Sequence, residues 1–297
     1  MNIRALVLLL AAALAACARS PRIERAAPAD VVFMSDFGGV DDAVAICKGV
    51  MFGVAPGLRV VDLTHDVPPF SIRDGARLLA GPTAYYPPGT VFLAVVDPGV
   101  GGSRRALVAH SRRGQFFVVP DNGLLTAIAD RDGLEEVREI TNPSWMRNPT
   151  TSATFHGRDI FAPVAARLAA GANWREVGPI VTDPVRIDVP SVARVPEGLR
   201  GEVVALDGHF GNALTNVGAA DFATLGHAAG DRVTVRVGTR ELRLPFVRTF
   251  AEVAVGEPLL YVDSRGNIAL AVNRGSFAER YRVAAPAPLL IHGKEGR

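Results

Sequence analysis

The stretch "TVFLAVVDPGVGGSRR", residues 90–105, sets the pattern for the first half of the chain. Its apolar run, Thr90–Val96, has the length and composition of a buried strand. The run stops at Asp97, and an Asp-Pro-Gly turn followed by a second glycine-rich turn brings Arg104 and Arg105 back within a few residues. A plain turn is satisfied by Asp-Pro-Gly alone. The presence of Asp97 and an arginine at the carboxyl end of this predicted strand therefore needs another explanation.

Apolar runs of this kind alternate with helical patterns between residues 31 and 180. "VVFMS", "LRVVDL", "ALVAH", "QFFVV" and "EEVREI" are further predicted strands. After the first of them, apolar residues recur at helical spacing at Val44, Cys47, Met51 and Val54. "SIRD", residues 71–74, has the pattern of a capping box and predicts a helix to about Tyr85, and "DIFAPVAARLAAG" predicts another. This alternation favours an α/β N-terminal domain with a mostly parallel sheet over residues 31–180.

The pattern changes over residues 181–198, which hold three prolines and no helical period, so we interpret them as a linker. Beyond them, short strand-like runs follow one another with little helix between: "GEVVAL", "RVTVRV", "RELRLPF", "PLLYVD" and "NIALAV". This predicts a small antiparallel β-barrel as the C-terminal domain, residues 199–297.

Composition limits the classes of partner. The chain of 297 residues is 48% hydrophobic, its mean hydropathy is +0.21 and its formal net charge is +2. It can bury a sizeable core, and its length favours two domains. Because acids and bases are mixed along the chain, without a basic block or an aromatic-basic stripe, we expect no nucleic-acid partner.

The N-terminus has the pattern of an export signal. Residues 1–17, "MNIRALVLLLAAALAAC", combine a basic start, a short apolar run and small residues. The last four resemble a bacterial lipobox, which implies cleavage before Cys17 and lipid attachment to its sulfur; the alternative is an ordinary secretory signal with a chance cysteine. Residues 18–30 are predicted to be a tether. We therefore expect an exported protein, lipid-anchored to a bacterial membrane and facing the periplasm.

Polar motifs follow several predicted strands: "SDFGGVDD", "THD", "DPGVGGSRR" and "PDNG", while "TFHGRD" precedes a helix. Ligands of open α/β sheets bind beyond the carboxyl ends of the strands, so convergence on one edge predicts a site. Each motif alone also fits a turn or a helix start. "SDFGGVDD" resembles the aspartate-rich calcium motif of nucleoside hydrolases, but Ser35 and Phe37 replace polar ligands there, which weakens a metal site.

Across nearly all of residues 31–290 the chain resembles the S-adenosylmethionine hydroxide adenosyltransferase family, relatives of the fluorinase and chlorinase enzymes. The residues that carry the resemblance are "SDFG", "CKGVM", "VVDLTHDVPPF", "VVDPGVGGSRR", "PDNGLL", "TFHGRDIFAPVAA", "DGHFGNALTN" and "SRGNIALAVNRGS". The resemblance implies an α/β domain followed by a β-barrel, and a homotrimer with the substrate between neighbouring subunits. It also implies hydrolysis of S-adenosylmethionine to adenosine and L-methionine, without a metal or other cofactor.

The family handles water with an Asp-Arg-His set, which falls on Asp97, Arg104 and His156 in this sequence. The resemblance places Asp36 at the ribose hydroxyls and Phe70 beside the sugar. It further assigns these residues to methionine and adenine: Asp207, Phe210, Asn212, Ser264, Arg265 and Arg274. Leu214 departs from the pattern, because the halogenases have an aromatic residue there.

Three further departures separate the chain from the halogenases. The segment 101–123 is too short for their extra loop, Tyr and Ser are replaced by His156 and Gly157, and an aromatic residue is replaced by Asp97. A fixed carboxylate repels halide and can hydrogen-bond water. Two alternatives stay open at this point: a calcium-dependent nucleoside hydrolase, and a non-catalytic lipid-anchored protein that binds adenosine or S-adenosylmethionine.

Overall fold

A computed structural model describes residues 29–147 and 152–294. The predicted signal peptide, Cys17 and nearly all of the predicted tether lie outside these residues. The chain forms two compact units. The first combines the chain up to Gly75 with Ala84–Val185, and the second combines Ala76–Thr83 with the chain from Arg186 onward.

The first unit is built on a six-stranded sheet with strand order β2-β1-β3-β5-β4-β6. The central pairs β1–β2, β1–β3 and β3–β5 are parallel, whereas β4 runs antiparallel to β5 and β6. A short hairpin joins β4 to β5, too short for the crossover that a parallel pair needs. The predicted mostly parallel sheet is thus confirmed. The strands are β1 (Val31–Ser35), β2 (Val60–Thr64), β3 (Val91–Val95), β4 (Ala106–Ser111), β5 (Phe116–Pro120) and β6 (Leu134–Glu139).

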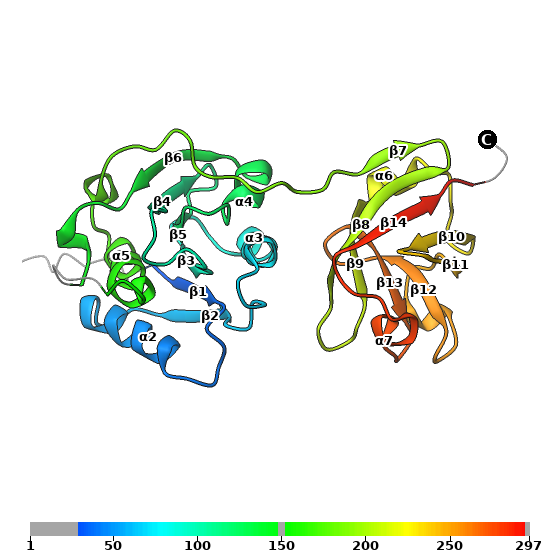
Figure 1. Ribbon diagram of the computed structural model, residues 1–297, viewed down its shortest axis with the longest axis horizontal. Helices are drawn as coiled ribbons and strands as arrows, with labels where there is room; N and C mark the ends of the chain where they lie inside the picture. The colour runs from blue at the N-terminus through cyan, green and yellow to red at the C-terminus, as the bar shows by residue number, and fades with distance from the viewer. Residues whose placement is uncertain (1–28, 148–151, 295–297) are drawn as a thin grey trace, which may run out of the picture. The chain divides into compact units, whose positions relative to one another are not determined.

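Helices cover this sheet because its central strands are apolar on both faces. Helices α2 (Ala43–Val54) and α5 (Ala162–Ala169) share one hydrophobic cluster with alternate residues of β1 and β3 (Figure 1). Cys47 and Met51 of α2 are fully buried in it, as their spacing predicts. On the other face Phe92 stacks on Phe117. None of the described helices is long and apolar enough to cross a membrane.

Helix α3 (Ile72–Ala80) begins where the capping box predicts and ends earlier than expected. The Ser71 hydroxyl donates to the Asp74 carboxylate at 2.8 Å, and the Asp74 N–H donates back to it at 3.3 Å. The expected continuation to about Tyr85 is wrong, because Gly81 and Pro82 interrupt the helix; Pro82 has no N–H to donate. A 3-10 turn, η1 (Thr83–Tyr85), follows instead.

Apart from α2, α5 and the first residues of α3, the helical segments of the first unit are short. They are α4 (Thr126–Arg131), the 3-10 turns η2 (Pro143–Trp145) and η4 (Trp174–Val177), and the π-helical turn η3 (Gly157–Phe161), which precedes α5.

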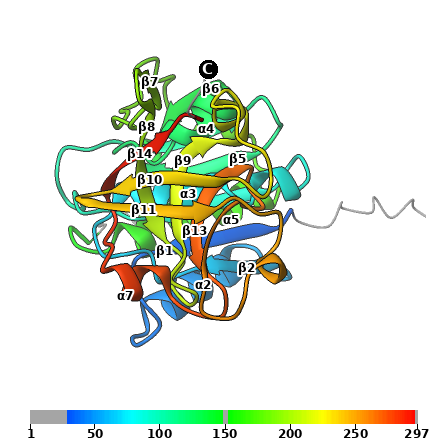
Figure 2. The same ribbon diagram turned by 90° about the vertical axis from the view of Figure 1, so that its right-hand side faces the viewer.

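The second unit is an eight-stranded antiparallel sheet with order β11-β10-β14-β8-β9-β13-β12, and β7 pairs with β8 (Figure 2). A bridge between Phe246 and Leu260 links the two ends of the order, so the sheet is nearly closed, in agreement with the predicted barrel. The strands are β7 (Ala193–Val195), β8 (Gly198–Leu206), β9 (Ala213–Gly218), β10 (Arg232–Val237), β11 (Arg240–Pro245), β12 (Pro258–Val262), β13 (Asn267–Val272) and β14 (Ala287–His292).

Three of these strands, β7, β9 and β14, are absent from the sequence prediction. Residues 181–198, interpreted as a linker, hold β7 and the first residue of β8. Helices α6 (Ala219–Ala223) and α7 (Phe277–Tyr281) and the turn η5 (Phe250–Glu252) complete the unit. The fully buried Phe277 contributes to its core.

Candidate active site

The turn after β3 returns Arg104 to Asp97, as the opening stretch predicts. Arg104 Nε donates to the two carboxylate oxygens at 2.9 and 3.1 Å, and Nη2 lies 2.5 Å from Oδ2. The exposed fraction of the side chain is 5% for Asp97 and 11% for Arg104. Such a forked ion pair, withdrawn from water, is fixed in orientation and strongly held.

His156 completes the set through the same guanidinium. Arg104 Nη2 donates to His156 Nδ1 at 2.6 Å, so this nitrogen carries the lone pair and the proton of the neutral ring is on Nε2. Burial and the positive charge of Arg104 lower the pKa of His156 below its ordinary 6.5, and Asp97 opposes this only in part. The ring is therefore neutral at pH 7. The structure thus brings Asp97, Arg104 and His156 together.

A proline explains the π-helical turn that begins next to His156. Pro163 has no N–H, so the carbonyl of Asp159, four residues earlier, has no helical partner. The Arg147 N–H donates to this carbonyl at 2.9 Å instead, and the Ala162 N–H bonds to the Gly157 carbonyl in the π-helical pattern. Turns of this type are frequent at functional sites.

Asp159, which the sequence analysis did not single out, anchors this turn. Its buried carboxylate accepts from Arg158 at 2.7 and 2.8 Å and from the Ser152 N–H at 2.8 Å. Arg158, the Ser152 N–H and Arg147 together lower its pKa to about 2 although burial opposes the shift. Asp159 is therefore ionised, and its carboxylate holds Arg158 and the Ser152 N–H in this turn.

The glycines of the Asp97–Arg104 turn allow it to pack tightly. Gly101 has φ +76°, and a Cβ there would lie 2.2 Å from the carbonyl oxygen of Ala153. A Cβ on Gly99 would lie 3.3 Å from the Arg104 side chain. The turn consequently abuts the segment that carries His156, and larger residues would separate the two.

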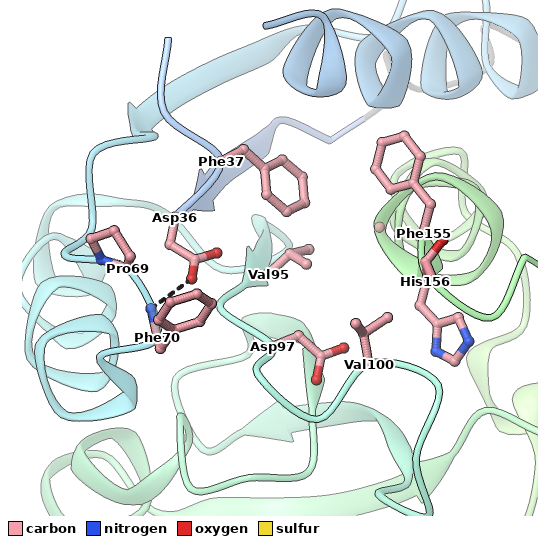
Figure 3. A pocket seen from close by; sticks show the side chains of 11 residues that line it. Asp36, Phe37, Pro69, Phe70, Val95, Asp97, Val100, Phe155 and His156 are labelled. Atoms are coloured by element: carbon pink, nitrogen blue, oxygen red, sulfur yellow. Dashed lines mark hydrogen bonds between the residues drawn. The ribbon is translucent and has the colours of Figure 1, made fainter. Parts of the chain in front are cut away.

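A cavity of about 240 Å³ opens at this end of the sheet (Figure 3). Asp36, Pro69 and Phe70 lie on one side of it, and Phe155 and His156 on the opposite side. The other residues that line it are Phe37, Val95, Asp97, Val100, Thr154 and Gly157. Its wall is mostly apolar, with two carboxylates and one imidazole, a composition typical of a small-molecule site.

Asp36 and Phe70 are joined at the rim of this cavity. The Phe70 N–H donates to Asp36 Oδ2 at 3.0 Å (Figure 3). Phe70 has φ +66°, a backbone conformation that non-glycine residues rarely adopt. The residue is 73% exposed, so its apolar ring lines the cavity without being buried in the core. Strain of this kind, of roughly 1–3 kcal/mol, is typical of functional positions.

The second arginine of the opening stretch has a different partner. Arg105 lies 2.6 Å from the carboxylate of the buried Asp121 in "PDNG" and 2.8 Å from that of Asp183. Asp121 also accepts from the Val185 N–H at 2.8 Å. Arg105 and Asp121 thus stabilise the fold, and only Arg104 faces the site.

In the second unit, the loop after β8 carries three of the predicted residues. The Asp207 N–H bonds to the carbonyl of the buried Asn212 at 2.8 Å, and the Gly211 N–H bonds to the Asp207 carbonyl at 2.6 Å. Gly211 has φ +66° and passes so close to Ser276 that a Cβ would lie 2.0 Å from its hydroxyl. Phe210 projects from this loop and is 68% exposed.

Ser264, Arg265 and Arg274 occupy two further turns and are exposed. Asp263 shapes the first turn, because its carboxylate accepts from the backbone N–H groups of Arg265 and Asn267 at 2.8 and 2.9 Å. Arg274 has φ +55° in the second. Within the described chain, the side chains of Ser264, Arg265 and Arg274 make no hydrogen bond.

Sequence reasoning missed several residues of both units. It passed over Val100, Thr154 and Phe155, and mentioned Phe37 and Gly157 only for their departures from known motifs. A Cβ on Gly157 would lie 3.0 Å from the Phe37 ring, so only a glycine at this position lets the Phe37 ring pack against the backbone next to His156. In the second unit, burial raises the pKa of Tyr261, and the negative charges of Asp263 and Asp207 raise it further.

The acidic motif "SDFGGVDD" does not converge as a cation site would. Asp36 is engaged by Phe70, and Asp41 accepts from the Ala43 N–H at 3.0 Å, next to the start of α2. Over residues 29–147 and 152–294, no group of three or more His, Cys, Asp or Glu side chains is arranged to hold a metal ion.

Comparisons with known proteins agree with this geometry. The family models "SAM hydroxide adenosyltransferase N-terminal domain" and "SAM hydroxide adenosyltransferase C-terminal domain" match residues 31–178 and 201–289. The chain is 44% identical over 254 residues to an (R)-S-adenosyl-L-methionine hydrolase of Salinispora tropica, covering 84% of this chain and 92% of the relative. It is 33% identical over 284 residues to a fluorinase of an Actinoplanes species, covering 86% and 94%. A solved structure of an uncharacterized conserved protein from Thermotoga maritima matches with a TM-score of 0.85 and 37% identity, covering 88% of this chain and 99% of that one.

Proposed function

Because the chain belongs to the SAM hydroxide adenosyltransferase family, we propose that it hydrolyses S-adenosylmethionine to adenosine and L-methionine. The observation that carries this proposal is the largely buried Asp97–Arg104 pair, bonded to the half-buried His156 beside an apolar cavity. Relatives 42% to 44% identical are named as hydrolases of S-adenosylmethionine. The nucleoside hydrolase and the non-catalytic binding protein are therefore not favoured.

The reaction exchanges one bond at the 5′ carbon of the substrate. A water oxygen forms a bond to this carbon, the carbon–sulfur bond breaks, and its electron pair stays on sulfur, which leaves as the neutral thioether of methionine. One proton is released to solvent. Because positive charge on sulfur is dispersed in the transition state, an apolar cavity favours the step more than bulk water does.

Asp97 and Arg104 orient the attacking water. The guanidinium engages both carboxylate oxygens, and Oδ1, which accepts only from Nε, keeps a further lone pair that can accept from water. Arg104 is always protonated and so fixes the carboxylate without competing for the proton. Holding the nucleophile in one place removes much of the entropic barrier of a bimolecular step.

His156 supplies a hydrogen-bond donor where Asp97 supplies an acceptor. With Nδ1 engaged by Arg104, its Nε2–H is left as a donor on a ring that lines the cavity. A water that donates to Asp97 and accepts from His156 is held in two directions, which points one lone pair at the reacting carbon. Protonation of His156 would need a second N–H where Arg104 already donates, so the neutral ring is the active form.

The other predicted residues are assigned to substrate recognition. Asp36 suits the vicinal hydroxyls of ribose, and Phe70 packs beside the sugar. In the second unit, Asp207 receives the methionine ammonium, Phe210 packs on the ligand and Asn212 reads the adenine edge. Ser264 and Arg265 receive the methionine carboxylate, and Arg274 contributes a backbone contact to adenine.

Water, rather than halide, is the nucleophile in this proposal. Asp97 is an acceptor that lines the cavity, and its negative charge disfavours an anion there. Incubation of the protein with S-adenosylmethionine and excess chloride or fluoride should yield adenosine and methionine in equal amounts. A 5′-halogenated nucleoside as the main product, or free adenine with a ribosyl product, would contradict the proposal; equal turnover with and without a chelator is expected.

We also propose that the protein acts as a homotrimer, with residues of the second unit completing the cavity of a neighbouring copy. This rests on the family resemblance and on the position of recognition residues in both units. Light scattering coupled to size exclusion should give three times the chain mass for active protein. An active monomer would contradict the proposal.

We propose further that the protein is exported and anchored by lipid at Cys17 to a bacterial membrane, facing the periplasm. The lipobox-like end of residues 1–17 supports this. Cys17→Ser should leave the precursor uncut or release the protein from membranes. Wild-type protein found entirely in a soluble fraction, without lipid by mass spectrometry, would contradict the proposal.

A further inference from the structure

A second chain of polar side chains lies beside the "SDFG" loop and is not used by the reaction above. Lys48 of α2 lies 2.6 Å from Asp62 Oδ2 of β2. Asp62 Oδ1 lies 3.1 Å from His65 Nε2, and His65 Nδ1 lies 2.7 Å from Ser35 Oγ at the end of β1. These contacts connect α2, β2 and the residue after β2 to Ser35, the residue that precedes Asp36.

The protonation of this chain follows from its members. An ionised carboxylate only accepts, so the His65 tautomer that fits this contact carries its proton on Nε2 and donates to Asp62. His65 Nδ1 then accepts, and the Ser35 hydroxyl is its donor. Ser35 Oγ in turn accepts from the Phe37 N–H at 3.3 Å. From the Phe37 N–H onward each group donates to the next as far as Asp62, which also accepts from Lys48 on its other side.

An irregularity in β2 brings His65 to this position. Phe33 of β1 pairs with Asp62, but the next residue, Met34, pairs with Thr64, so Leu63 is an extra residue on β2. A bulge of this kind transfers every later side chain to the other face and re-aims it. His65 thereby comes level with Ser35.

Backbone bonds from the same residues hold the loop on both sides of Asp36. The Gly38 N–H donates to the His65 carbonyl at 2.7 Å, and the Val67 N–H donates to the Ser35 carbonyl at 3.4 Å. Asp36 itself lies between Ser35 and Phe37, the two ends of the side-chain contact. The backbone on both sides of Asp36 is therefore tied to this connection, while its carboxylate accepts from the Phe70 N–H.

The Ser35–His65–Asp62 order also resembles a nucleophilic triad, but its burial excludes that role. Ser35 has an exposed fraction of 0% and does not line the cavity, so no substrate atom can reach its hydroxyl. The nucleophile of such a triad must be accessible to substrate. The chain is suited to hold the loop rather than to react.

We propose that His65 is a positioning residue for substrate recognition, which fixes Asp36 and Phe37 through the Ser35 hydroxyl. The proposal rests on the assignment of Asp36 to ribose in the proposed function. It predicts that loss of the His65 acceptor weakens substrate binding and leaves the Asp97–Arg104–His156 chemistry largely intact.

The test compares His65→Phe with His65→Asn, Ser35→Ala and a control. The His65 ring packs edge to face on Phe33 with 4.7 Å between ring centroids, and phenylalanine keeps such a ring but has no hydrogen-bond acceptor. Asparagine can instead offer its side-chain carbonyl to the Ser35 hydroxyl. The control is His110→Phe, because His110 pairs with Glu135 at 2.8 Å, packs on an aromatic ring and lies outside the cavity.

For His65→Phe and Ser35→Ala we expect KM for S-adenosylmethionine to rise roughly tenfold, the scale of one lost hydrogen bond, with kcat within about threefold of wild type. His65→Asn should recover part of the KM, and His110→Phe should leave KM unchanged. An unchanged KM in folded His65→Phe, or a loss of kcat alone, would overturn the proposal.

Hydrogen exchange of the ligand-free protein separates this proposal from the proposed function. The amides of Phe37 and Gly38 should exchange faster in His65→Phe than in wild type and be unaffected in His110→Phe. Equal protection in all three proteins would refute the positioning role even if turnover is confirmed. Absence of wild-type turnover would refute the function, and with it the substrate part of the proposal, while the exchange data would still decide whether His65 holds the loop.

Discussion

The two units of the chain prepare their candidate residues in opposite ways. In the first, Asp97, Arg104 and His156 are bonded to one another and largely withdrawn from water. In the second, Phe210 is exposed, and the Arg265 and Arg274 side chains make no hydrogen bond to described residues. Only the backbone of those turns is fixed. If the proposed assignments hold, the catalytic groups are preorganised, whereas the exposed recognition side chains of the second unit can adjust to a ligand.

The largest effect is expected from a substitution that disrupts the Asp97–Arg104–His156 set. Arg104→Ala removes the partner of both Asp97 and His156, so kcat should fall by roughly a hundredfold or more, the scale of one positioned catalytic group. The neighbouring Arg105→Ala is the control, because Arg105 binds Asp121 and Asp183 instead. It should lower the free energy of unfolding and leave kcat within a few-fold. Equal kcat losses in the two variants would contradict the assignment.

The next prediction compares a turn in each unit. Gly101 and Gly266 have φ of +76° and +80°, but a Cβ meets the Ala153 oxygen at 2.2 Å only in the first; at Gly266 nothing lies within 4 Å. Gly266→Ala should lower the free energy of unfolding by roughly 1 kcal/mol. Gly101→Ala should lower it further and reduce kcat by more than tenfold, since a shifted turn misplaces Asp97. Equal losses, measured by denaturant unfolding and steady-state kinetics, would show that the close contact is unimportant.

The sequence predicts what depends on local pattern and misses what depends on distant partners. The strand before Asp97, the capping box at Ser71 and the Asp97–Arg104 return follow from residues close together in the chain. Strands β9 and β14 become strands only through their neighbours in the sheet. The missing N–H of Pro163 is visible in the sequence, but Arg147, which takes the freed carbonyl, lies sixteen residues before it, so the π-helical turn was not foreseen.

Residues of the cavity wall show the same limit. Phe37 and Phe155 meet edge to face at 6.0 Å although they belong to separate elements. In sequence, an aromatic residue beside a polar motif is as typical of core packing as of a site. Family resemblance names the groups that carry charge and hydrogen bonds, but only the fold shows which apolar side chains enclose them.

A smaller effect is expected from the exposed residues of the second unit. Arg265→Ala should raise KM roughly tenfold, the scale of a charge-assisted hydrogen bond to the methionine carboxylate, with kcat within about threefold. Arg240→Ala is the control, because Arg240 is an exposed arginine on β11 of the same unit. A fall in kcat at unchanged KM for Arg265→Ala would place Arg265 with the preorganised set and remove the contrast between the units.

The smallest effect near neutral pH concerns the protonation of His156. Burial and Arg104 lower its pKa below 6.5, so the ring is neutral above that value and the activity should be flat from pH 7 to 8. As the pH falls below 6.5 and through the folded pKa, kcat/KM should decline toward a tenfold loss per unit. Because the folded state disfavours the added proton, the free energy of unfolding contributed by this histidine should fall over the same interval. His156→Asn should lower the rate and abolish this acid limb, measured over pH 5–8. An inflection above 6.5, or a limb that survives in His156→Asn, would assign the titration to another group and separate His156 from the preorganised set.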